Sequence, residues 1–132
     1  MPTVLIAFAV LATAFVVGIS ILNVLIRNRA QAMNGQPLPD LPGDVGAGIR
    51  GADRGLVYFF SPRCGACKSV TPRMRALREK NRNVFLIDIS QSLDIARALR
   101  VMATPSVLEV ANGQIVQMHI GHPPNEVMRR FA

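Results

Sequence analysis

Tryptophan is absent from this sequence of 132 residues, which holds only two cysteines and in which aromatic residues make up 5%. Two cysteines are too few for a disulfide-rich scaffold, and the length allows one compact domain rather than a multidomain enzyme. Basic residues exceed acidic ones, giving a net charge of +7, yet they form no long basic block. With so few aromatic side chains to stack on bases, this charge does not predict a nucleic-acid partner.

Much of the basic excess lies in residues 73–82, where Glu79 is the only acidic side chain beside five basic ones. Such a segment is typical of a solvated helix face. An electrostatic site for an acidic partner or for anionic lipid headgroups is the alternative interpretation.

Charge is missing altogether from Val4 to Ile26, a run with only three polar residues. As a helix rising about 1.5 Å per residue, this run could cross a hydrocarbon core of about 30 Å. The sequence therefore predicts a single-pass transmembrane anchor over residues 1–27, with residues 4–26 in contact with the lipid bilayer.

Two other interpretations of this run are weaker. A cleaved signal peptide would use Ala30-Gln31-Ala32 as its cleavage site, but the apolar stretch is too long and the site lies beyond Arg27 and Arg29. A buried core helix would require a small domain to enclose it on all sides. For an anchor, Arg27 and Arg29 place the following body in the cytoplasm by the positive-inside rule.

Residues 28–54 change in character, because prolines without a regular period alternate there with glycines. This composition favours an extended, weakly structured tether. The prediction is a folded domain over residues 55–132, held off the membrane by that tether.

Short apolar runs and amphipathic segments alternate within the domain. Strands are predicted at residues 56–60, 84–89, 106–110 and 115–120, and helices at residues 67–81, 93–100 and 124–131. Pro72 should kink the first helix or distort its first turn, Ser92 should cap the second, and Asn112-Gly113 marks a hairpin. A strand–helix–strand start implies a parallel pair, and the hairpin adds antiparallel strands, so an α/β domain with one mixed sheet is expected.

Both cysteines lie in Cys64-Gly65-Ala66-Cys67, between the first predicted strand and the first predicted helix of the domain. Backbone N–H groups and the dipole at a helix amino terminus stabilise a thiolate, and Arg63 and Lys68 should favour it further. We expect Cys64 to attack a substrate disulfide and Cys67 to resolve the mixed disulfide. A zinc or copper site would need His119 and His122, whose distant position and close spacing are unlike those of a zinc finger.

At this point the sequence resembles the thioredoxin superfamily from about Gly55 to Ala132. The matching features are the strand before the motif, Cys64-Gly65-Ala66-Cys67-Lys68, Pro72, the strand ending in Asp88, and Ala103-Thr104-Pro105-Ser106. The resemblance implies a thioredoxin-like fold with a mixed four-stranded sheet flanked by helices. It also implies a cis peptide bond before Pro105, with Thr104 and Pro105 docking the substrate chain opposite the cysteines. No cofactor is expected beyond the redox-active Cys64–Cys67 pair.

Departures from the family pattern narrow the expected function. Arg63 stands where thioredoxins proper carry tryptophan, Ala66 where they carry proline, and Tyr58 where they carry a buried acid. The first strand and helix of the family are missing or reduced to residues 44–53. The chain is more similar to membrane-tethered thioredoxin-like proteins of bacterial envelopes, which serve particular clients, often in metalloprotein or cytochrome maturation. This resemblance implies a bacterial inner-membrane protein with a periplasmic body, against the arginine count.

The leading hypothesis is thus a membrane-anchored thiol:disulfide oxidoreductase that exchanges disulfides with client proteins through Cys64 and Cys67. One alternative is a non-catalytic structural or assembly subunit of a membrane protein complex, with the thioredoxin-like body as its interaction module. Another is metal delivery through the two cysteines and a histidine.

Overall fold

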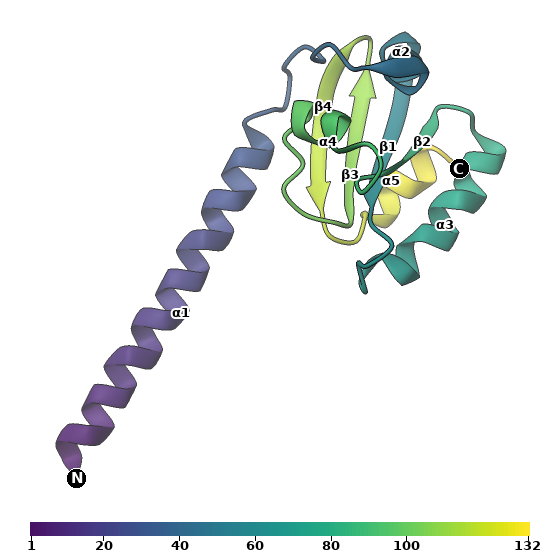
Figure 1. The fold of residues 1–132 in the computed structure, drawn as a ribbon. Helices are drawn as coiled ribbons and strands as arrows, with labels where there is room; N and C mark the ends of the chain where they lie inside the picture. Colours follow the sequence, from purple (N-terminus) through teal and green to yellow (C-terminus); the bar gives the residue numbers. More distant parts are fainter.

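The computed structural model describes the backbone of residues 1–132 and every side chain except those of Arg29 and Ala30. A long helix projects from a body in which helices surround one sheet (Figure 1). The elements are α1 (Pro2–Gln31), α2 (Gly43–Gly51), β1 (Arg54–Phe60), α3 (Cys67–Lys80), β2 (Val84–Asp88), α4 (Leu93–Ala98), β3 (Ser106–Ala111), β4 (Gln114–Ile120) and α5 (Asn125–Arg130). From β1 onward, the predicted order of strands and helices is confirmed.

The sheet has four strands in the order β2-β1-β3-β4. β1 pairs in parallel with β2 and antiparallel with β3, which pairs antiparallel with β4. Asn112 and Gly113 join β3 to β4 with φ angles of 50° and 73°, the left-handed conformation that a two-residue hairpin turn requires. The mixed thioredoxin-like sheet expected from the sequence is therefore present.

Alternating side chains of the central strand β1 pack on opposite faces of the sheet. Val57 and Phe59 join a cluster with residues of α4 and with Leu41 and Ile49 from the α2 region. Leu56 and Tyr58 join a second cluster with residues of α3 and α5. All four of these β1 side chains are fully buried, because helices cover both faces.

The prediction of an extended tether over residues 28–54 is wrong. α1 continues to Gln31, Gly43–Gly51 is helical, and Leu41 and Ile49 are buried in the core. Residues 33–38 also lie against the sheet, where the Gly35 N–H donates to the Ile115 carbonyl at 2.6 Å. Gly46 is not a sign of flexibility, because a Cβ there would collide with the Leu41 backbone. The folded body thus begins well before residue 55.

Two local details differ from expectation. Ser92 occupies the N-cap position of α4 without a capping side-chain bond, and Asp94 Oδ1 instead accepts from the Ile95 N–H at 2.9 Å. α4 ends at Ala98 because the chain turns at Arg100, whose φ is 51°. The expected helix around Pro72 is present as α3.

α1 is apolar along most of its length and lies outside the body. Its segment Pro2–Asn28 has a mean hydropathy of 2.7 and is 0% buried, so the interpretation as a buried core helix is wrong. Thr13 and Ser20 donate their hydroxyls to the carbonyls of Ala9 and Val16, which satisfies these polar groups within the helix. By length and composition the segment could cross a membrane, and a signal sequence would share both properties.

Candidate active site

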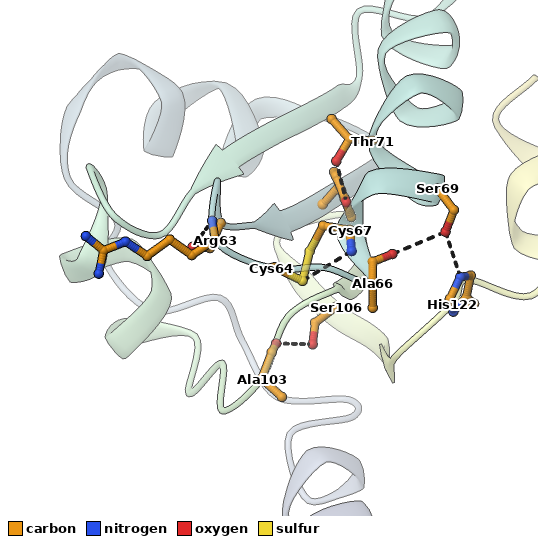
Figure 2. Close-up of a disulfide and its surroundings, with 11 residues drawn as sticks. Arg63, Cys64, Ala66, Cys67, Ser69, Thr71, Ala103, Ser106 and His122 are labelled. Carbon is orange, nitrogen blue, oxygen red and sulfur yellow. Dashed lines mark hydrogen bonds between the residues drawn. A yellow bond between two sulfur atoms is a disulfide. The ribbon is translucent and has the colours of Figure 1, made fainter.

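The two cysteines lie where β1 ends and α3 begins. β1 ends at Phe60, a short turn carries Cys64, and Cys67 is the first residue of α3. The structure joins Cys64 and Cys67 in a disulfide, with their Cα atoms 5.3 Å apart (Figure 2). This is the oxidised form of the pair.

The environments of the two sulfur atoms differ. Cys67 is 2% exposed, whereas Cys64 is only partly buried. The Cys67 backbone N–H points at Cys64 Sγ at 3.2 Å. Once the disulfide is reduced, that donor and the amino end of α3 would both favour a negative charge on Cys64.

The Thr104-Pro105 segment lies at the same end of the sheet as the cysteines. Its peptide bond is cis, as the resemblance implies. Pairing of Phe59 with Ser106 brings the end of β1 beside the start of β3, and Figure 2 shows Ala103 and Ser106 near the Cys64 turn. Two bonds fix the segment: Ser106 Oγ donates to the Ala103 carbonyl at 2.6 Å, and the Gly121 N–H donates to the Pro105 carbonyl at 2.8 Å.

Arg63 and Lys68 flank the motif on the exposed surface. The Arg63 N–H donates to Ser61 Oγ at 3.3 Å, and its side chain is directed away from the disulfide in Figure 2. Lys68 lies in the first turn of α3 and lines a groove of about 670 Å³ beside the cysteines. Tuning of the thiolate by these two charges stays a prediction.

Tyr58 occupies the position at which the family carries a buried acid. Its side chain is fully buried, and its hydroxyl bonds Thr71 Oγ1 at 2.9 Å. Burial raises the pKa of Tyr58 above 10.0, although the bond from Thr71 acts in the opposite direction. Thr71 lies one helical turn after Cys67 on α3, so a neutral hydroxyl pair stands on the helix of the buried cysteine, where the family carries a carboxylate on the strand.

The two histidines lie apart from the cysteines' sulfur atoms and bond to other groups. His119 Nε2 lies 3.1 Å from Oε1 of the buried Glu109, which also accepts from Arg130 at 2.9 Å. His122 Nε2 lies 3.0 Å from Ser69 Oγ. Among the side chains that the structure describes, no three of His, Cys, Asp and Glu come together as a metal site.

Ser69 ties the motif to the loop after β4. Its hydroxyl donates to the Ala66 carbonyl at 3.2 Å, and its oxygen lies 3.0 Å from His122 Nε2. Sequence reasoning missed this contact and the Glu109 cluster, because both join residues that are distant along the chain. The position of Ser69, two residues after Cys67, is the one feature of the sequence that could have indicated a role near the motif.

Comparisons with known proteins agree with this geometry. The thioredoxin family model matches residues 48–132. A thioredoxin of Echinococcus granulosus is 33% identical over 78 residues, which cover 58% of this chain and 69% of that protein. The chain belongs to the thioredoxin family.

A further relative and a solved structure are also similar to this chain. A disulfide bond formation protein of Brevibacillus choshinensis is 30% identical over 83 residues, covering 60% of this chain and 70% of that protein. The oxidised mitochondrial thioredoxin 3 of Saccharomyces cerevisiae superposes with a TM-score of 0.52 at 27% identity, covering 63% of this chain and 80% of the yeast chain. As a thioredoxin-family protein, the chain is a thiol:disulfide oxidoreductase that exchanges disulfides with client proteins.

Proposed function

We propose that this thioredoxin-family protein is anchored in a membrane by α1 and exchanges disulfides with clients through Cys64 as nucleophile and Cys67 as resolving thiol. The observation that carries these roles is the asymmetry of the pair. Cys64 is partly exposed and accepts a backbone N–H, whereas Cys67 is buried beneath it. Only the exposed sulfur can be reached by a protein substrate.

The exchange requires no group beyond the two thiols and the client disulfide. The Cys64 thiolate attacks one client sulfur, forming a bond between Cys64 Sγ and that sulfur, and the other client sulfur leaves as a thiolate. Cys67 then loses its proton and attacks Cys64 Sγ, which closes the Cys64–Cys67 disulfide and releases the second client thiolate. Two electrons pass to the client, whose thiolates take protons from water, and the reverse sequence oxidises a client dithiol.

The remaining site residues support this chemistry without forming bonds in it. Thr104 and Pro105 stand at the sheet end that carries Cys64, where an extended client chain can pair with the Thr104 backbone. Lys68 faces the groove beside the cysteines and adds positive charge near the thiolate, whereas Arg63 would contribute only from its neighbouring place in the sequence.

The anchor assignment rests on the length and apolarity of Pro2–Asn28 and on its 0% burial in the body. By resemblance to membrane-tethered relatives of bacterial envelopes, we propose the inner membrane with the body in the periplasm. Arg27 and Arg29 favour the opposite orientation by the positive-inside rule. A membrane-impermeant thiol reagent applied to intact, reduced cells decides the question: labelling of Cys64 supports a periplasmic body, and labelling only after lysis contradicts it.

Trapping tests the catalytic roles. In a Cys67→Ala protein, Cys64 should accumulate mixed disulfides with clients in native membranes, since nothing resolves them. The matched Cys64→Ala protein should trap none. Absence of adducts from both variants would contradict the proposed roles.

The presence of Tyr58 in place of an acid supports a second candidate function, that of an assembly subunit in a membrane complex. A buried phenol with a raised pKa cannot take the proton from Cys67 as a carboxylate can. If a protein with Cys64→Ser and Cys67→Ser supports every phenotype that deletion abolishes, the non-catalytic function is correct.

A further inference from the structure

The active site lies on the side of the body from which α1 departs. The last turns of α1 line two grooves along β4: Asn23 and Arg27 lie near His122 in one, and Ile26 lies near Ile120 in the other. Further along the chain, Gly35 bonds Ile115 and Pro37 bridges Gln114. α1 therefore runs alongside β4 and leaves the body past the Ile120 end of that strand (Figure 1).

That end of β4 belongs to the active-site end of the sheet. Ile120 pairs with Ser106, and the Gly121 N–H bonds the Pro105 carbonyl. Hence the Thr104-Pro105 loop faces the same side as the apolar length of α1. If Val4 to Ile26 fills the hydrocarbon layer, the groove shared with Ile26 lies where that layer ends.

The exposed side chains in this groove have the composition of a lipid-contacting surface. Met102 is 68% exposed and Ile120 37%, and both line the groove with Ile26. Arg97 and Arg100 line it too, and none of its described lining residues is acidic. Apolar side chains beside arginines without carboxylates are complementary to the boundary between acyl chains and anionic headgroups.

We infer that this surface, made of Met102, Ile120, Arg97 and Arg100, rests on an anionic lipid surface and holds the active site against the membrane. The inference rests on the proposed anchoring by α1 and goes beyond it, because an anchor alone leaves the orientation of the body open. In this orientation the body presents the Cys64–Cys67 disulfide to clients whose sulfur atoms lie close to the headgroups.

The absence of tryptophan makes the orientation directly measurable. Full-length Met102→Trp and Ile120→Trp proteins are reconstituted in phosphatidylglycerol vesicles containing lipids brominated near the top of the acyl chains. Val45→Trp is the matched control, since Val45 is a 45% exposed apolar residue on α2 at the opposite end of the sheet. Circular dichroism confirms that each variant folds.

We expect bromolipid to quench Met102→Trp and Ile120→Trp fluorescence at least about twofold more than that of Val45→Trp. Replacing Arg97 and Arg100 with glutamine in the Met102→Trp protein should reduce the quenching. Arg82→Gln, which removes a charge from the other end of the sheet, should leave it unchanged. Replacing phosphatidylglycerol with phosphatidylcholine should reduce the quenching as the loss of the two arginines does.

The outcomes separate this inference from the anchor itself. If the proteins float with the vesicles but all three tryptophans stay equally unquenched, the proposed orientation is wrong and the anchor is still supported. In that case a protein partner is the alternative ligand of this surface. Proteins that do not float with the vesicles would overturn the anchor and the inference together.

Discussion

The helix α1 and the central strand β1 are both apolar runs, yet their surroundings are opposite. The segment Pro2–Asn28 of α1 is 0% buried in the protein, whereas Leu56 to Phe59 of β1 are 0% exposed. Hydrophobicity alone therefore does not say which medium a segment occupies. Length and hydrogen bonding do, because a long helix can bury itself in lipid and a short strand cannot.

Hydrogen bonding explains the difference. α1 satisfies its backbone internally, and even Thr13 and Ser20 bond carbonyls of the same helix. β1 must pair with β2 on one edge and β3 on the other, so its side chains are fixed where two helical layers cover them. α1 can therefore lie outside the body without affecting its fold, whereas β1 stabilises the body.

The largest effect should come from truncating the core of β1. Phe59→Ala should lower the free energy of unfolding by about 3–5 kcal/mol, because it removes a fully buried ring and leaves a cavity. Urea denaturation of the full chain in detergent micelles measures this. The matched Phe15→Ala in α1 should leave the unfolding of the body unchanged, and an equal loss in both variants would contradict the contrast.

A charge in the middle of α1 should have the next largest effect. Val16→Arg should weaken membrane insertion by about 2.5–3.5 kcal/mol, the cost of arginine near the centre of a spanning helix. The inserted fraction is measured by alkaline extraction of native membranes. Val116→Arg, at an exposed position of β4, should extract like the unaltered protein. Equal extraction of the two variants would refute α1 as a span.

Local patterns predicted the fold where each element depends on its own residues. The apolar run of β1, the helical spacing of α3 and the Asn112-Gly113 turn all met their predictions. Residues 33–51 did not, because their glycines allow turns and close packing within a folded segment: Gly35 and Gly43 have φ angles of 77° and 72°. Gly46 allows the chain to approach Leu41 closely, and no local pattern reports such an approach.

The same limit applies to the site. Sequence reasoning placed Cys64 and Cys67 correctly at the strand-to-helix junction, because the motif and its position are local. The bond between Ser69 and His122 and the contacts of Glu109 could not be predicted, since sheet pairing and the loop after β4 create them. Residue types alone gave these positions no distinguishing pattern.

Polar groups offer a smaller test of the contrast between α1 and the body. Glu109→Gln should lower the free energy of unfolding by about 1–3 kcal/mol, since it removes a buried charged acceptor from His119 and Arg130. Thr13→Val in α1 should leave the unfolding of the body unchanged, because the Thr13 hydroxyl bonds only its own helix. Denaturation in micelles compares the two, and an unaffected Glu109→Gln protein would show that the cluster is not stabilising.

The smallest effect should come from the one hydroxyl on the buried part of β1. Tyr58→Phe should lower the free energy of unfolding by about 0.5–1.5 kcal/mol near pH 8, because the bond to Thr71 is lost. Burial raises the pKa of Tyr58 above its ordinary 10.0, so above that pH the unfolded chain loses the proton first. The advantage of the unaltered protein should therefore shrink as pH rises past 10, because Tyr58→Phe lacks this titration. Denaturation of both proteins at pH 8 and at about pH 10.5 measures the gap, and a gap that widens would contradict the assigned direction.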